Sequence, residues 1–217
     1  MTQAASDPYR PARLLLELRR QGVTDDAVLK AIETVNRADF AAPELADLAY
    51  EDCALPIGCG QTLYSPIVAG QLLQALGIRP GADMRVFVIG AGSGYTMALA
   101  AQMAGTVAGI DRYYSLVDGC SRVHERYDGG AVYRYYHGDG LGGLDTGEGF
   151  DRILLAGAID EIPSALTRLL PRGGRMVAPV DHGDGVVLRI LGGDGSLAEH
   201  TLSRTIGRLV AGPAKRL

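Results

Sequence analysis

Three glycines at alternate positions, Gly90, Gly92 and Gly94, form the part of the sequence best suited to binding a ligand. They follow the apolar run at 85–90 and precede a helix-prone stretch, so the chain can turn sharply there and its backbone can approach a ligand closely. The dinucleotide-binding fingerprint places its third glycine five residues after the first. In this chain Tyr95 occupies that position. The spacing therefore favours S-adenosylmethionine over NAD as the cofactor.

Two carboxylates strengthen this interpretation. Asp111 closes the next apolar run, 106–111, about 20 residues after the first glycine, where an acidic side chain can accept both ribose hydroxyls. Asp139 ends a third run, in the position expected to contact adenine. A turn, a helix cap or a β-turn would explain each feature alone. All three fall at the carboxyl ends of predicted strands, the side on which open α/β sheets bind ligands, so together they favour a cofactor site.

The surrounding pattern alternates strand and helix. Predicted strands lie at 85–90, 106–111, 131–139, 151–158 and 175–180, with helical patterns between most of them and over 162–170, which indicates a parallel sheet covered on both faces. Two β-rich stretches flank the glycine-rich turn at 192–195 and predict a hairpin, so one edge strand should run antiparallel.

The region before this pattern is helical and irregular. Helical periodicity covers 11–40 with a break near Gly22, and helix resumes over 67–76, which predicts an N-terminal cap. Glycines and prolines make 50–66 an irregular loop rich in polar side chains. We expect residues 1–80 to form this cap and a substrate loop within the same domain, and residues 81–217 to form the cofactor-binding core.

Composition narrows the class of protein. The net charge of −4 argues against nucleic acid as the main partner, and no apolar run reaches the length of about 18 residues that suggests a membrane span. Cys53, Cys59 and Cys120 lack paired metal-ligand spacing and indicate free thiols in a reducing cytosol. Basic residues are almost all arginine, which is typical of a GC-rich bacterial genome. The chain is expected to be cytoplasmic and to bind no metal.

Four stretches resemble the protein-L-isoaspartate O-methyltransferase family: YEDCALPIGCGQT, VFVIGAGSGY, HGDGLGGL and FDRILLAGAIDEIPSALTRLLPRGGRMVAPV. The resemblance runs in order from about residue 12 to residue 191. It implies a Rossmann-like α/β methyltransferase fold, with a mostly parallel seven-stranded sheet, an antiparallel edge strand and an N-terminal helical cap. It also implies methyl transfer from S-adenosyl-L-methionine to a carboxylate, which in this family is the α-carboxylate of an isoaspartyl residue.

Site residues are carried over by position. The glycine turn would hold the methionine portion of the cofactor, Asp111 the ribose, and Asp139 with Gly140 the adenine, while Thr62 would line the acceptor site. The candidate cofactor-binding residues are Gly90, Ala91, Gly92, Ser93, Gly94, Tyr95, Asp111, Arg112, Asp139 and Gly140. The candidate catalytic residues are Thr62, Tyr64 and Ser65.

The chain departs from the family at three places. Tyr64 stands where the family has an active-site serine, with Ser65 one residue later, and Val88 stands where the family has an acidic residue. The C-terminal stretch RLVAGPAKRL also differs from the family's usual ending. The first departure predicts an altered acceptor site. Tyr64 would either contact the acceptor or partly fill the pocket, and Val88 is most simply a buried strand residue.

The predicted chemistry needs few catalytic groups. A carboxylate with a pKa near 4 is ionised at pH 7 and needs no general base, whereas an alcohol or amine acceptor usually needs one. His137 is the nearest candidate base, with a turn or core histidine as the simpler interpretation. The leading hypothesis is a carboxyl O-methyltransferase acting on a peptide, protein or small molecule. A catalytically impaired binding module is the alternative, and glycine spacing disfavours a nicotinamide oxidoreductase. The oligomeric state stays open.

Overall fold

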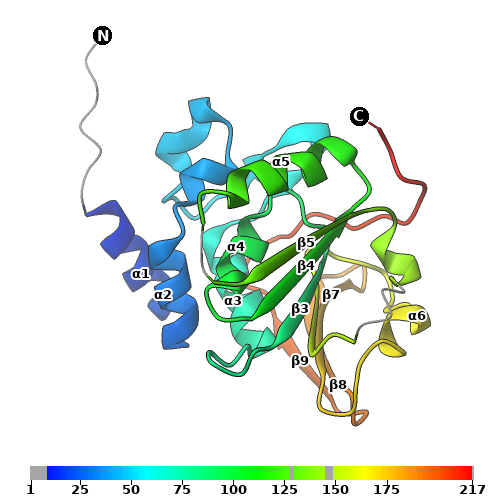
Figure 1. Cartoon of the computed structure of the whole chain (residues 1–217). Helices are drawn as coiled ribbons and strands as arrows, with labels where there is room; N and C mark the ends of the chain where they lie inside the picture. Colours follow the sequence, from blue (N-terminus) through cyan, green and yellow to red (C-terminus); the bar gives the residue numbers. More distant parts are fainter. Residues whose placement is uncertain (1–8, 128–129, 145–148, 217) are drawn as a thin grey trace.

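A seven-stranded sheet forms the centre of the structure, a computed structural model that describes residues 9–127, 130–144 and 149–216 (Figure 1). Residues 1–8 of the predicted cap lie outside the described residues. The strand order is β5-β4-β3-β6-β7-β8-β9. The strands are β3 Arg85–Ile89, β4 Thr106–Asp111, β5 Val132–His137, β6 Arg152–Leu155, β7 Arg175–Asp181, β8 Val186–Gly192 and β9 Leu197–Thr201.

Strands β3 to β7 pair in parallel, and their sequences show why both faces are buried. In β3, Val86 and Val88 belong to one apolar cluster, whereas Phe87 and Ile89 belong to another on the opposite face. All four side chains are buried. A central parallel strand covered on both sides reads as a continuous apolar run, as this one does. The predicted parallel sheet is therefore confirmed.

Helices form the two outer layers. The α-helices are α1 Arg10–Arg20, α2 Asp26–Thr34, α3 Pro66–Leu76, α4 Tyr95–Ala101, α5 Tyr114–His124 and α6 Ser164–Thr167. The short 3-10 helices are η1 Arg37–Phe40, η2 Pro43–Leu48, η3 Gly58–Gly60 and η4 Gly140–Gly142. Buried side chains of α1 to α5 join the apolar cluster on one face of the sheet, whereas α6 and η4 pack against the other face.

Two expectations differ in detail from the structure. The helix expected over 162–170 is limited to the four residues of α6, which starts directly after Pro163. The antiparallel strand is β8, which lies one position in from the edge because the hairpin returns β9 along its outer side. The predicted antiparallel pairing is thus confirmed, but the edge strand itself is β9.

The order of the strands determines where a ligand can bind. From β3 the chain proceeds through β4 to β5 on one side, then returns to place β6 on the other side of β3. Open α/β sheets bind ligands outside the carboxyl ends of the strands, where the winding changes direction. Here that point lies between β3 and β6, beside the turn that follows β3.

A buried arginine organises the loop between the cap and the sheet. The loop contains β1 Leu55–Pro56 paired antiparallel with β2 Thr62–Leu63. The Arg37 guanidinium is buried and donates to the carbonyl oxygens of Ala49 (3.0 Å), Cys53 (2.9 Å) and Tyr64 (3.1 Å). Burial lowers the pKa of Arg37. One cation thus fixes both ends of the loop through backbone acceptors.

Replacing Arg37 with methionine should lower the free energy of unfolding by about 2–4 kcal/mol, because three buried carbonyl groups lose their donor while the side-chain stem keeps much of its volume. Urea unfolding followed by circular dichroism measures this change. The control is Arg19→Met, which removes an exposed guanidinium paired with Asp26. An R37M midpoint equal to that of the control would contradict the role given to Arg37.

Candidate functional site

The glycine turn after β3 requires its three glycines. Gly90, Gly92 and Gly94 have φ angles of +84°, +57° and +87°, in the left-handed region that L side chains rarely adopt. The N–H groups of Gly90 and Ala91 donate to the carbonyl oxygen of Ile110 at 2.9 and 3.1 Å. The turn is therefore fastened to the carboxyl end of β4.

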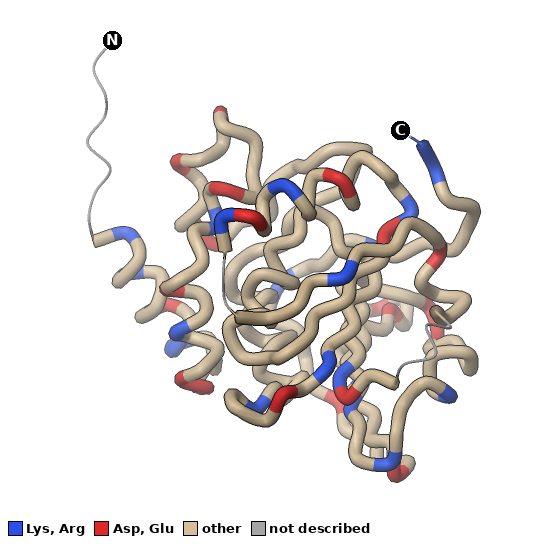
Figure 2. Tube along the Cα trace, in the orientation of Figure 1, with Lys and Arg blue, Asp and Glu red and all other residues tan. Residues whose placement is uncertain are grey.

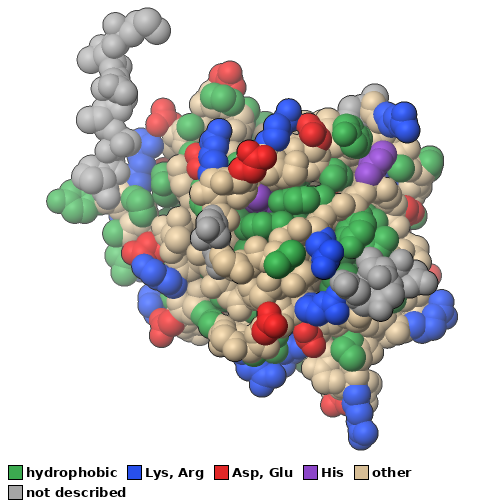
Figure 3. Space-filling model, viewed as in Figure 1, with side chains coloured by type: hydrophobic (Ala, Val, Ile, Leu, Met, Phe, Trp, Pro, Cys, Tyr) green, Lys and Arg blue, Asp and Glu red, His purple; other side chains and the backbone are tan. Residues whose placement is uncertain are grey.

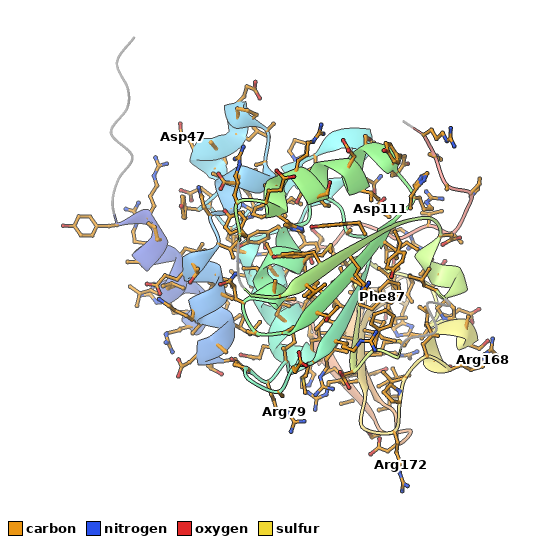
Figure 4. The ribbon with its side chains drawn as sticks, viewed as in Figure 1. Asp47, Arg79, Phe87, Asp111, Arg168 and Arg172 are labelled. Carbon is orange, nitrogen blue, oxygen red and sulfur yellow. The ribbon has the colours of Figure 1, made fainter. Side chains whose placement is uncertain are left out.

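Asp111 lies beside this turn at the end of β4. Its carboxylate accepts hydrogen bonds from the N–H groups of Gly92 (2.9 Å) and Tyr113 (3.0 Å). Figure 4 shows Asp111 near the upper ends of the strands, whereas Arg79 and Arg172 lie at the opposite end of the sheet. The two backbone donors fix the orientation of the carboxylate and leave further lone pairs on its oxygens.

Asp139 holds the corresponding place after β5. Its carboxylate accepts from the N–H groups of Leu141 (3.0 Å) and Gly212 (2.8 Å). A Cβ atom added at Gly140 would lie 2.6 Å from methyl carbons of Ile89 and Ile110, so only glycine fits at this position without a shift. Gly140 and the two isoleucines therefore form an apolar surface in the site, and the Asp139 carboxylate lies beside it.

These groups surround one cavity of about 220 Å³. Five of the predicted cofactor-binding residues line it: Gly90, Asp111, Arg112, Asp139 and Gly140. The sequence did not identify the other residues that line it, which are Gln61, Ile89, Ile110, Tyr113, Gly138, Leu141, Arg208, Leu209 and Val210. Gln61 belongs to the same GQT stretch as Thr62, so a signal for it was present.

A C-terminal strap, residues 206–216, closes one side of the cavity. At one end Arg208 forms ion pairs with Asp160 and Asp181. At the other end the Lys215 N–H donates to the Arg112 carbonyl oxygen at 2.6 Å. Between them the Leu209 side chain packs so close to Gly90 that a Cβ there would lie 2.5 Å from it. In Figure 1 the red C-terminal segment runs along the upper edge of the sheet.

The remaining predicted cofactor residues lie elsewhere around the turn. Gly92 and Ser93 line a second, more apolar groove of about 480 Å³ between the η1–η2 segment and α5. Ala91 is buried, and Tyr95 is buried in the core with its ring centroid 5.4 Å from that of Phe40. The turn therefore separates two hollows, and the two carboxylates face only the first.

The three predicted catalytic residues have different environments. Thr62 is exposed, and its Oγ1 atom lies 3.2 Å from where a Cβ on Gly207 of the strap would be. Tyr64 is buried, and its hydroxyl forms a hydrogen bond with the Thr96 hydroxyl. Burial raises the pKa of Tyr64 to about 12. Ser65 is buried and caps α3, accepting from the Val68 N–H. Only Thr62 is positioned near the cavity.

Two further sequence predictions can be placed. Val88 is fully buried on the face of β3 covered by α3 and α4, as expected for a strand residue. His137 is exposed, and its Nε2 atom lies 3.0 Å from the Arg112 carbonyl oxygen and 3.1 Å from that of Lys215. Both of its partners are acceptors, so Nε2 carries the proton and ties the strap to the end of β4.

The described residues show neither a metal-ligand cluster nor a membrane-spanning helix in addition to this cavity. Within residues 9–127, 130–144 and 149–216 no three His, Cys, Asp or Glu side chains cluster as metal ligands. Among the same residues no helix has the length and apolar character that crossing a bilayer requires. Figures 2 and 3 show acidic and basic residues interspersed, with no stripe of one sign on the visible face.

Comparisons with known proteins agree with this geometry. The family model for protein-L-isoaspartate(D-aspartate) O-methyltransferase matches residues 10–203. The chain is 39% identical over 180 residues to the protein-L-isoaspartate O-methyltransferase of Azorhizobium caulinodans, covering 83% of this chain and 82% of that protein. The Aeropyrum pernix protein of the same name is 40% identical over 192 residues, which is 86% of this chain and 73% of that protein.

The fold also matches a solved structure. A Plasmodium falciparum protein described as a protein-L-isoaspartate O-methyltransferase, in complex with S-adenosyl-L-homocysteine, superposes with a TM-score of 0.74 at 22% identity, covering 91% of this chain and 97% of that chain. At this identity the match supports the fold alone. With the sequence relatives, the conclusion is that the chain belongs to the protein-L-isoaspartate(D-aspartate) O-methyltransferase family, as its motifs predicted, and thus to the S-adenosylmethionine-dependent methyltransferases.

Proposed function

We propose that this chain transfers a methyl group from S-adenosylmethionine to the α-carboxylate of an isoaspartyl residue in a peptide or protein. The observation that carries the proposal is the single cavity in which the glycine turn, Asp111 and Asp139 meet Gln61 of the acceptor loop. The names of the sequence relatives support the choice of acceptor. A location in the cytosol stays a prediction.

The donor is assigned to the cavity group by group. Gly90, the residue of the turn that lines the cavity, would lie against the methionine portion, and the Asp111 carboxylate would accept the two ribose hydroxyls, with Arg112 alongside. Adenine would lie over Gly140 with its amino group directed at Asp139. Gly212 already donates to Oδ2 of Asp139, but a carboxylate oxygen can accept two hydrogen bonds, so the strap and the adenine amine are compatible there.

The reaction places modest demands on the protein. S-Adenosylmethionine supplies a methyl group on a sulfonium, and an acceptor oxygen forms its bond to the methyl carbon as the carbon–sulfur bond breaks. An ionised carboxylate attacks without a general base, which agrees with the exposed position of His137. The strap and the acceptor loop would align the two reactants and keep water out of the cavity, which are the main sources of rate in such a displacement.

Thr62 is the best placed of the three predicted catalytic residues, because it lies next to the strap at the cavity. We assign Tyr64 and Ser65 to the support of the loop, since their hydroxyls bond to Thr96 and to the start of α3. Direct contact of Tyr64 with the acceptor would require its phenol to leave Thr96 and turn toward the cavity.

Methylation of an isoaspartyl peptide tests the proposal directly. With labelled S-adenosylmethionine, we expect a base-labile methyl ester on the isoaspartyl peptide and none on the same sequence containing ordinary aspartate. Label in neither peptide, together with tight binding of S-adenosylhomocysteine, would instead favour the catalytically impaired binding module. Label on other lysate components alone would favour an altered acceptor.

Replacing Asp111 with alanine should raise the Kd for S-adenosylhomocysteine at least about tenfold, because hydrogen bonds to a charged group contribute about 1.5–3 kcal/mol. Isothermal titration calorimetry measures this. Asp118→Asn on the exposed side of α5 is the control, since it changes a carboxylate paired with Arg122 and away from the cavity. Equal affinities for the two variants would remove Asp111 from the donor site.

Replacing Tyr64 with phenylalanine should lower the free energy of unfolding by about 1 kcal/mol, because the buried Thr96 hydroxyl loses its partner. The kcat and KM for the isoaspartyl peptide should stay within about twofold of wild type. The double variant Y64F/T96V should recover stability, since both partners are then apolar. A large loss of kcat with unchanged stability would place the phenol in the acceptor site instead.

A further inference from the structure

Two side chains of α5 hold the rear of the glycine turn. The His124 ring is buried, and its Nε2 atom lies 2.8 Å from the Gly94 carbonyl oxygen. The buried Cys120 thiol donates to the Gly92 carbonyl oxygen at 3.3 Å. Neither residue lines the cavity, and the family motifs in the sequence include neither. We call this pair the α5 brace.

The hydrogen-bond partners define the state of each group in the brace. The Gly94 carbonyl can only accept, so Nε2 of His124 carries the proton, and Nδ1 then accepts from the Tyr135 hydroxyl at 2.9 Å. Burial lowers the pKa of His124, which favours this neutral form. Burial also raises the pKa of Cys120 to about 12, so the sulfur keeps its proton and can donate.

The brace fits the turn closely. The His124 ring stacks on Tyr133 with centroids 4.4 Å apart and an interplanar angle of 18°, which fixes its plane. A Cβ added at Gly94 would lie 2.8 Å from Nε2 of His124 and 3.0 Å from the Cys120 sulfur. A larger residue therefore does not fit at Gly94, where the turn packs closely on α5, and two hydrogen bonds link the turn to that helix.

The brace is connected to the donor site through one peptide segment. Gly92 donates its N–H to the Asp111 carboxylate on the cavity side, and its carbonyl accepts from Cys120 on the opposite side. The position of that carboxylate therefore depends on a turn held from behind by α5. Release of the turn would change the distance between the turn and Asp111. The ribose and methionine portions of the donor could then no longer bind to Asp111 and to the turn equally well at the same time.

We propose that His124, assisted by Cys120, is a positioning residue for the methyl donor: it sets the glycine turn against Asp111 without touching donor or acceptor. This proposal depends on the function proposed above, because it assumes that the donor binds at the turn. It extends that function by assigning donor affinity to residues outside the cavity. The acceptor peptide, which would lie near Thr62 and the strap, should not sense the brace.

The test compares His124→Leu, which removes the donor, with His124→Gln, which keeps an N–H near the position of Nε2. By calorimetry with S-adenosylhomocysteine, we expect H124L to raise the Kd about tenfold and H124Q to stay within about threefold of wild type. In kinetics, H124L should raise the KM for S-adenosylmethionine and leave the KM for the isoaspartyl peptide unchanged. A general structural defect would not separate the two KM values.

Leu18→Ala is the matched control, because it opens a buried site in α1, which packs on α2 and α3 away from the turn and the cavity. It should lower the melting temperature and leave the Kd for S-adenosylhomocysteine unchanged. Should H124L fail to fold, Cys120→Ala and Cys120→Ser replace it, with the Kd raised in the alanine variant and near wild type in the serine variant, whose hydroxyl can donate.

The possible results separate the two proposals. Unchanged affinity in H124L or C120A, or equal losses in H124L, H124Q and the L18A control, overturns the role of the brace while the proposed function stands. Failure of the wild-type chain to bind S-adenosylhomocysteine overturns both.

Discussion

The attachment of the glycine turn to the end of β4 is the interaction on which the site depends. One carbonyl, that of Ile110, accepts two N–H groups of the turn, and the next side chain, Asp111, accepts a third. This arrangement is possible only because three residues of the turn adopt left-handed backbone angles. Two neighbouring strands of a parallel sheet thus place a sharp turn and a carboxylate at a fixed separation. The rest of the cavity is assembled around that pair.

The other walls come from segments distant in sequence. The loop organised by Arg37 brings Gln61 to the cavity and Thr62 to the C-terminal strap, which closes the cavity from the far side. The strap is held by backbone hydrogen bonds and ion pairs at the ends of the strands, whereas the loop is held by the Arg37 side chain and by its own β1–β2 pairing.

Much of the fold, and the placement of the glycine turn and the two carboxylates at the candidate site, could be predicted because the information is local. The apolar run of β3, the glycine spacing and the acidic residues after β4 and β5 each specify their own structure. The position of each strand within the sheet was harder to predict. The antiparallel strand β8 is internal because β9 pairs along its outer side, and the residues of β8 alone do not specify this. The sequence marked RLVAGPAKRL as a departure from a family ending that helps to shape the substrate pocket, but its individual contacts could not be predicted, since they join residues far apart in the chain.

Tyr64 illustrates the limit of position-by-position comparison. The resemblance marks it as a departure from the family, but whether a departure alters chemistry depends on where the side chain points. In the structure the phenol bonds to Thr96 in the core, which gives the larger residue a structural partner of its own. Val88 is similar, because its side chain faces the helices rather than the cavity. His124 shows the converse, since a residue outside every motif contacts the turn from behind.

The most direct test of the account is a crystal structure of the chain with S-adenosylhomocysteine at saturating concentration. We expect both ribose hydroxyls within hydrogen-bond distance of the Asp111 carboxylate and the adenine ring over Gly140, enclosed by the strap. Ligand bound instead in the apolar groove behind the glycine turn, or an empty cavity at saturation, would contradict it.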